Sequence, residues 1–216
     1  MLTILTQYDH RYSDLADITS PSKRAYADRY GYEFVEVRGF PDSSIPVNWQ
    51  KIPTLLKALD DSEWVIWTDA DSMFMNLEYD IVTLIDQGIG IVAGMHVISY
   101  DTKDYVLHGG NILFRSSPLV KDFLSESLDM YGKVRQDRLM EELAYTAVWK
   151  RRQEYRKMVK LVKLPILCTI PRHTAYMNDI VGFSYYSPGD FILHFMAPLP
   201  YNDRVLLARR YAHVSS

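Results

Sequence analysis

The hydrophobic positions of the chain fall into short runs that are separated by stretches with helical spacing. The strongest run is Glu63–Thr68, in which all residues from Trp64 to Trp67 are apolar. A strand without apolar–polar alternation has both faces buried, which is typical of a central parallel strand. Further strands are predicted at Leu2–Thr6, Tyr32–Val37, Ile89–Ala93, Asn111–Arg115, Val159–Leu164 and Phe191–His194.

Segments with helical spacing lie between these runs. Ser20-Pro21 indicates an N-cap followed by proline at the first helical position. This helix is expected to end near Gly31, because glycine is common just after a helix. Ser117-Pro118 repeats the same opening signal. The polar segments 38–48 and 99–108 are expected to be loops near a site. Further helices are predicted at Gln50–Leu59, Asp80–Asp86, Asp137–Met158 and Tyr201–His213.

Strands that alternate with helices predict an α/β sandwich, with a mostly parallel central sheet flanked by helices. No shift in composition divides the chain, so residues 1–216 are expected to form a single domain. Ligands of such sheets bind beyond the carboxyl ends of the strands. Candidate chemistry is therefore expected where the strands end.

Composition excludes several classes of protein. The chain has 24 basic and 27 acidic residues, a net charge of −3. A nucleic-acid-binding domain carries a basic excess, so no nucleic-acid partner is expected. Hydrophobic residues make up 48% and charged residues 24% of the chain, which is typical of a globular domain. Aromatic residues reach 13%; their faces suit sugars and nucleobases, and they equally suit cores.

Two features bear on the compartment. The apolar run Gly88–Met95 is far shorter than the ~18 residues that a membrane span needs, and the N-terminus lacks the basic region of a signal peptide. Cys168 is the single cysteine, which excludes an intramolecular disulfide and, on this count, a cysteine-based zinc site. We expect a cytoplasmic protein, or one that is soluble in a reducing compartment, with no membrane span in this chain.

Asp69-Ala70-Asp71 directly follows the strongest predicted strand. Two carboxylates one residue apart can both reach one cation. The hard cations Mg²⁺ and Mn²⁺ prefer oxygen ligands and keep positions open for phosphate oxygens. The Asp-X-Asp pattern is common by chance, and the alternative is a solvated turn in which aspartate satisfies backbone groups. Its place after a buried strand favours the metal site.

Two further motifs contain histidine. In His108-Gly109-Gly110-Asn111, the paired glycines allow positive φ and a close approach of the backbone to a ligand. Asn111 could then bond hydroxyl groups; the alternative is a tight turn that leads into a strand. His194 ends an apolar run. It is either a satisfied core histidine or a neutral imidazole that ligates a metal beside the aspartates.

Charged residues supply the remaining candidates. Glu141-Glu142 lies on a predicted helix rich in Arg and Lys, where adjacent acids usually form a solvated, salt-bridged face. A carboxylate aimed at a sugar could instead act as base, nucleophile or electrostatic stabiliser. The basic residues that could bind a diphosphate are Lys23, Arg24, Lys51 and Arg115.

Taken together, these segments resemble the retaining glycosyltransferase family 34, the galactosyl-, xylosyl- and mannosyltransferase group. The order and spacing of the motifs match over about residues 1–196. The specific part is the Asp-X-Asp block followed by Asn76, together with a distant His-Phe pair. The matching segments are Ser20–Tyr26, Tyr30–Phe34, Trp49–Lys51, Trp64–Asn76, Gly109–Asn111 and Gly189–Phe195.

The resemblance implies a GT-A fold, which is a nucleotide-sugar-binding α/β sandwich, with a divalent metal ion, Mn²⁺ or Mg²⁺. It implies a hexosyl- or pentosyltransferase that moves a sugar from a UDP-sugar to a hydroxyl of a glycan or glycoprotein, with retention. The residues that it assigns are Asp69, Asp71 and His194 as metal ligands, Thr6 and Tyr8 along the nucleotide, and Asn111 facing the donor sugar or acceptor. Lys23 and Lys51 stay candidates for the diphosphate on their charge alone.

The chain departs from the family at two points. Glu141-Glu142 stands where the family has an Asp-Gln pair; one of these carboxylates would stabilise positive charge on the sugar or, in an inverting enzyme, act as general base. After His194-Phe195 a family lysine is absent, and Arg204 is the candidate to supply that charge. Without an anchor or stem, the chain more closely resembles a stand-alone bacterial or viral catalytic domain.

Other functions remain open. A strand that ends in Asp-X-Asp is also the nucleophile loop of haloacid-dehalogenase-like phosphohydrolases, although their motif lies on the first strand and here at least two strands precede it. A non-catalytic sugar- or nucleotide-binding module would fit the aromatic content. A nucleotidyltransferase of similar fold usually has a glycine-rich loop after the first strand, and Thr6–Asp9 contains no glycine.

Overall fold

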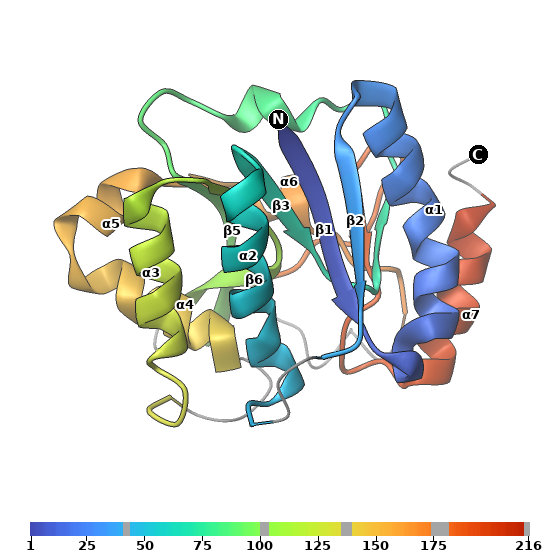
Figure 1. The fold of residues 1–216 in the computed structure, drawn as a ribbon. Coiled ribbons are helices and arrows are strands. Elements are labelled where there is room, and N and C mark those ends of the chain that lie inside the picture. Colours follow the sequence, from blue (N-terminus) through green and yellow to red (C-terminus); the bar gives the residue numbers. More distant parts are fainter. Residues whose placement is uncertain (41–43, 100–103, 135–139, 174–181, 214–216) are drawn as a thin grey trace.

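The computed structural model describes residues 1–40, 44–99, 104–134, 140–173 and 182–213. Its centre is a six-stranded sheet in the order β2-β1-β3-β6-β5-β7 (Figure 1). Neighbouring strands are parallel except at β6, which runs antiparallel to both β3 and β5. The predicted α/β class with a mostly parallel sheet is confirmed. The strands are β1 Leu2–Tyr8, β2 Glu33–Arg38, β3 Trp64–Thr68, β5 Ile91–Ser99, β6 Asp104–Arg115 and β7 Val159–Val162.

Helices cover both faces of this sheet (Figure 1). One face packs against α2 (Lys51–Asp61), α3 (Pro118–Leu128), α4 (Met140–Arg151) and α5 (Gln153–Met158). The other face packs against α1 (Ser13–Tyr30), α6 (Leu164–Leu167) and a two-stranded sheet of β4 (Ser72–Phe74) and β8 (Ile192–His194). The last helix, α7 (Tyr201–Ala212), lies beside α1. Short 3-10 helices are η1 His10–Tyr12, η2 Val47–Gln50 and η3 Ile81–Leu84.

Strand β3 lies at the centre of the molecule, and all of its residues are buried. Val65 and Trp67 belong to the core shared with α2, α3 and α4, while Trp64 and Ile66 belong to the core on the α1 face. Because successive residues of a strand point to opposite faces, an unbroken apolar run fills both cores. The predicted central position is confirmed, although only one neighbour of β3, strand β1, is parallel to it.

Helix α1 differs from its prediction at the N-terminal end. It begins at Ser13, so Ser20-Pro21 lies inside the helix and does not open it. The Ser20 hydroxyl donates to Glu36 Oε1 at 2.8 Å and caps no helix. Leu15 in the first turn is fully buried, and tertiary burial of this kind offsets the hydrogen bond that proline removes. Gly31 ends the helix with φ of 67°, as predicted.

The loop predicted over residues 99–108 is wrong. Strand β5 continues to Ser99 and β6 starts at Asp104, while residues 100–103 lie outside the described part. His108-Gly109-Gly110 is therefore inside β6, and neither glycine has positive φ, so the alternative of a tight turn is also wrong. Polar residues on these strands, such as His96 and His108, are buried at a site, and their polarity does not mark exposure to solvent.

Two smaller differences concern the lengths of elements. The helix predicted over Asp80–Asp86 is only the 3-10 turn η3. The helix predicted over Asp137–Met158 is two helices, α4 and α5, because Arg152 between them is extended, with φ of −116° and ψ of 143°; residues 137–139 and, in the segment 38–48, residues 41–43 lie outside the described part. Ser117 caps α3 as predicted. In the part of the chain that the structure describes, no helix combines the length and apolar character that a membrane crossing requires.

Candidate active site

A cavity of about 450 Å³ opens at the end of the sheet where β1 and β3 finish. This is the edge at which such sheets bind ligands, and the volume is typical of a small-molecule site. Aromatic rings on its wall come from Tyr8, Tyr12, Phe40, Trp67 and Phe183. Its charged and other polar side chains are Gln7, Asp9, Arg11, Asn48, Lys51, Asp69, Asp71, His96, His108, Glu141, Glu142, His194 and Arg204.

Hydrogen bonds to the backbone groups of the Asp69–Asp71 turn fix its position. Asp69 N donates to Gly110 O of β6 at 2.8 Å. From α1, Lys23 Nζ donates to Asp69 O at 3.0 Å, and Thr19 Oγ1 donates to Ala70 O at 2.6 Å. With the carbonyls bound on the α1 side, the Asp69 and Asp71 side chains are left to face the cavity. The alternative of a solvated surface turn is wrong, since Asp71 is buried.

His194 meets these aspartates although it lies 123 residues from Asp71. Strand β8 pairs with β4 so that His194 is opposite Ser72, and Phe195 N donates to Asp71 O at 2.8 Å. His194 Nε2 is 2.9 Å from Asp71 Oδ1 and 3.8 Å from Asp69 Oδ2. One ligand atom from each of the three side chains lies within 4.8 Å of the others, an arrangement that could hold a metal ion.

Charge stabilises the ionised form of this cluster. Burial raises the pKa of Asp71, but His194 and Arg204 outweigh it and lower that pKa below its ordinary value. Burial lowers the pKa of His194, but Asp71 outweighs it and raises that pKa well above its ordinary value. Arg204 reaches the cluster from α7, with Nη1 3.2 Å from Asp71 Oδ2. Two carboxylates beside a histidine form a donor set suited to a hard divalent cation.

Glu141 and Glu142 are only 6% and 8% exposed, so the solvated face expected for this pair is wrong. Both lie in the first turn of α4 and line the cavity. Lys51 Nζ lies 2.6 Å from Glu141 Oε1, 3.4 Å from Asp69 Oδ1 and 3.3 Å from Gly109 O. Burial lowers the pKa of Lys51, but Asp69 and Glu141 outweigh it, so this pKa is raised and the side chain is a cation.

Glu142 is surrounded by hydrogen-bond donors. His96 Nε2 is 3.1 Å from Oε2, His108 Nδ1 is 3.2 Å from Oε1, and Gly109 N donates to Oε1 at 2.8 Å. Burial raises the pKa of Glu142, but the two histidines outweigh it and lower the pKa well below its ordinary value. Glu142 is therefore an ionised carboxylate in a buried place, which is a group able to stabilise positive charge.

The paired glycines of β6 provide space for these side chains. A Cβ on Gly109 would lie 3.1 Å from Glu142 Cγ, and a Cβ on Gly110 would lie 2.7 Å from His194 Cε1. Any larger residue would therefore displace the acidic pair on one side or the imidazole on the other. The close approach that the sequence predicts at these glycines is to side chains of the protein.

The residues expected along the nucleotide lie at different depths. Tyr8 and Lys51 line the cavity, whereas Thr6, Lys23 and Asn111 do not. Thr6 and Asn111 are fully buried, and their side-chain polar atoms have no hydrogen-bond partner among the described residues. Burial lowers the pKa of Lys23 to about 8, and its Nζ lies beneath the aspartate turn.

The other basic candidates lie away from the cavity. Arg24 pairs with Glu36 at 3.2 Å, and Arg115 lies 3.9 Å from Glu63, in both cases with about half of the arginine side chain exposed. Sequence reasoning missed His96 and gave Cys168 no role at the site. Neither carries a local signal, because His96 lies in an ordinary strand and Cys168 ends a short helix; only the fold brings His96 to the cavity and Cys168 beside His194.

The architecture is that of the GT-A glycosyltransferases, as comparison with solved structures shows. A glycosyltransferase involved in glycosylation of the major capsid of PBCV-1 superposes with a TM-score of 0.72 at 15% identity, over 97% of this chain and 98% of that one. The galactosyltransferase LgtC, solved with donor and acceptor sugar analogues, gives 0.55 at 15% identity over 99% and 95%. GlyE of Streptococcus pneumoniae gives 0.60 at 12% identity over 98% and 61%.

Within that class, residues 1–87 match the model of the galactosyl transferase GMA12/MNN10 family, which confirms the resemblance seen in the sequence. Two relatives come from Schizosaccharomyces pombe. An alpha-1,2-galactosyltransferase is 28% identical over 93 residues, which is 40% of this chain and 22% of the relative. An uncharacterized alpha-1,2-galactosyltransferase is 34% identical over 68 residues, 28% of this chain and 18% of the relative. The matches thus span about a fifth of each relative.

Proposed function

We propose that the chain is a metal-dependent glycosyltransferase that moves a sugar from a UDP-sugar to a hydroxyl group of a glycan or glycoprotein, with retention of configuration. The observation that carries this proposal is the meeting of Asp69, Asp71 and His194 at the wall of one cavity, in a chain with the GT-A fold. The S. pombe galactosyltransferases support a hexose as the sugar, without fixing which one.

The donor set fits a hard divalent ion, Mn²⁺ or Mg²⁺. Asp69 Oδ2, Asp71 Oδ1 and His194 Nε2 would hold it, since these atoms already face one another. When bound, such an ion neutralises charge that develops on a diphosphate leaving group. Asp71 is kept ionised by its neighbours, so no proton has to leave it when a cation binds.

The nucleotide would lie along the aromatic side of the cavity, near Tyr8 and Tyr12 at the end of β1. Aromatic faces suit a nucleobase, and uridine is the base that the family resemblance implies. Arg204 reaches into the cavity beside Asp71, which supports it as the charge that replaces the family lysine near a diphosphate. Lys51 adds a second buried cation on the side of Glu141.

Glu142 is the group we assign to the reacting sugar. As the bond from the sugar to the diphosphate breaks, positive charge develops on the sugar carbon, and a fixed carboxylate on the opposite face stabilises it. The acceptor oxygen attacks from the side of the leaving group and forms the new bond. Its proton passes to the oxygen of the departing diphosphate, which leaves no net change of proton at Glu142. Glu141 accepts a hydrogen bond from Lys51 and thereby positions the Lys51 side chain.

Substitution of the aspartates tests this assignment. We expect Asp69→Asn and Asp71→Asn each to lower turnover of UDP-sugars by about 100-fold or more, because each removes a carboxylate that would hold the ion. Asp60→Asn, on the exposed pair with Lys121, is the matched control and should keep full activity. Wild-type turnover in either site variant, measured as UDP release, would remove the metal assignment.

The alternatives are not favoured. The Asp69–Asp71 pair follows the third strand along the chain, and solved structures that superpose on this chain include glycosyltransferases. Binding of a sugar or nucleotide alone does not require an ionised, buried carboxylate at the cavity wall, which argues against a non-catalytic module.

A further inference from the structure

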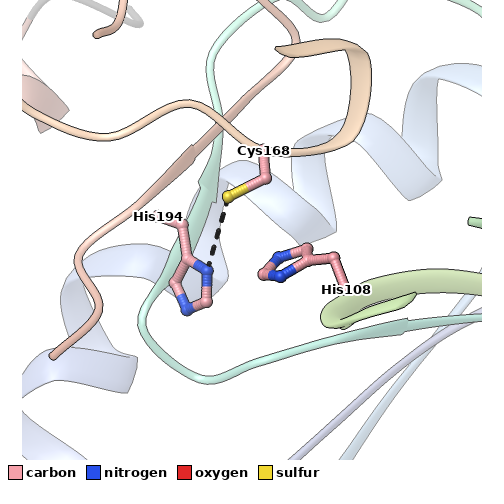
Figure 2. Close-up of side chains that lie close together, drawn as sticks. All are labelled: His108, Cys168 and His194. Atoms are coloured by element: carbon pink, nitrogen blue, oxygen red, sulfur yellow. Dashed lines mark hydrogen bonds between the residues drawn. The ribbon is translucent and has the colours of Figure 1, made fainter. Parts of the chain in front are cut away.

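A second group of potential ligands lies behind the first. Cys168, at the end of α6, is fully buried, and its thiol faces the imidazoles of His108 and His194 (Figure 2). Cys168 Sγ is 3.7 Å from His194 Nδ1, and one ligand atom from each of the three residues lies within 4.8 Å of the others. His108 is only 2% exposed, and neither of its ring nitrogens has a hydrogen-bond partner among the described residues.

A carboxylate lies beside the outer nitrogen of each imidazole, and the one at His194 is in a hydrogen bond. His108 Nδ1 lies 3.2 Å from Glu142 Oε1, which leaves Nε2 for the cluster. His194 Nε2 lies 2.9 Å from Asp71 Oδ1, which leaves Nδ1 for Cys168. Histidine ligands of metals usually donate their second N–H to a carboxylate in this way, and the carboxylate sets the tautomer and the ring orientation.

We propose that His108 Nε2, Cys168 Sγ and His194 Nδ1 form a second metal site, with three protein ligands, that takes Zn²⁺. A thiolate and two imidazoles are ligands that zinc prefers. With Zn–S of about 2.3 Å and Zn–N of about 2.0–2.1 Å in a tetrahedron, the sulfur and nitrogen lie about 3.6 Å apart, close to the 3.7 Å found between Cys168 and His194. The count of one cysteine had excluded a cysteine-based zinc site, but that count left out the two histidines that supply the other two protein ligands here.

The proposed site shares His194 with the hard-ion site, and this consequence rests on the proposed function. A histidine that ligates a metal is a neutral imidazole, which carries one proton. With zinc on Nδ1, the proton is on Nε2 and bonds Asp71; with a hard ion on Nε2, the proton is on Nδ1 and faces Cys168. One metal therefore excludes the other at His194, so zinc should lower Mn²⁺-dependent turnover.

Cobalt titration of the intact chain tests the site without any transferase assay. Co²⁺ held by a thiolate absorbs in the near ultraviolet by charge transfer from sulfur, and Cys168 is the single cysteine. We expect this band at one Co²⁺ per chain, displaced by Zn²⁺ and absent from Cys168→Ser. His108→Gln should weaken cobalt binding at least about 10-fold, as loss of one ligand does.

Two control variants separate this site from its neighbours. Asp69→Asn should keep the band, since Asp69 belongs only to the hard-ion site, and His96→Gln should keep it because His96 belongs to the His96–His108–Glu142 group. Cobalt bound to the wild type without the band, no cobalt bound at all, or unchanged affinity in His108→Gln would each overturn the proposal. If the band is present and UDP-sugar turnover is absent, the zinc site stands and the proposed function fails.

Discussion

The residues of the site differ in how well their roles can be predicted from the sequence. Asp69 and Asp71 are visible because they follow a buried strand directly. His194 is not, since a lone histidine on an apolar run is ambiguous, and only the family resemblance assigned it to the metal. The sequence did not indicate that Glu142 is buried, because the basic residues near it on the predicted helix suggest a solvated face. The two histidines beside it, His96 on β5 and His108 on β6, are distant in the sequence.

At this scale Glu142→Gln is the decisive change. We expect turnover to fall about 100-fold or more, because the neutral amide cannot stabilise positive charge on the sugar. Manganese-dependent binding of UDP should change little, since Glu142 is not among the proposed ligands. Glu154→Gln, an exposed glutamate on α5, is the matched control. Steady-state kinetics of both variants decide the matter, and an unchanged kcat in Glu142→Gln would exclude the catalytic role.

Elements were predicted well where one kind of burial dominates. The run Trp64–Trp67 serves two cores at once and was placed correctly. Strands β5 and β6 were predicted only in part, at Ile89–Ala93 and Asn111–Arg115, because polar residues such as His96 and His108 face a buried site and resemble a loop when read along the chain. The helix start predicted at Ser20-Pro21 is wrong, because packing of the preceding turns extends the helix back to Ser13 in spite of the local capping signal.

Strand β6 makes its own prediction through Gly110. A Cβ there would lie 2.7 Å from His194 Cε1 and 2.9 Å from His108 Nε2, so Gly110→Ala must displace the imidazoles. We expect manganese-dependent UDP affinity to fall about 10- to 100-fold, as it does when the orientation of a ligand is lost.

Gly90→Ala is the matched control for this change, because its Cβ would lie 2.8 Å from Val120 Cγ2 in the core, away from the cavity. It carries a similar packing cost without touching the ligands. Calorimetric titration and thermal unfolding of both variants separate affinity from stability. Equal UDP affinities in the two variants would show that Gly110 does not support the site.

The whole molecule assembles its site from segments far apart in the sequence. The α/β class follows from alternating patterns, but the strand order does not, because local patterns carry no information on which strands pair. The order β2-β1-β3-β6-β5-β7 is what sets β6 beside β3 and brings Gly110 under the aspartate turn. Helix α7 packs on α1 near the C-terminus of the chain and places Arg204 beside Asp71.

Arg204 is therefore expected to contribute to binding of the nucleotide, although it lies far from Asp71 in the sequence. We expect Arg204→Gln to weaken UDP binding by about 10-fold or more, since a hydrogen bond to a charged group contributes about 1.5–3 kcal/mol. Binding of Mn²⁺ should persist, because Asp69, Asp71 and His194 remain. Arg209→Gln, exposed on the same helix, is the control. Undiminished UDP affinity in Arg204→Gln would place the diphosphate elsewhere.

The central claim is that Asp69, Asp71 and His194 hold a hard metal ion that binds a nucleotide diphosphate. Calorimetric titration of UDP into the protein, first with Mn²⁺ and then with EDTA, tests it most directly. We predict binding with a stoichiometry of one that requires Mn²⁺ and disappears with EDTA. Equal binding of UDP in both conditions, or no binding in either, would contradict the account.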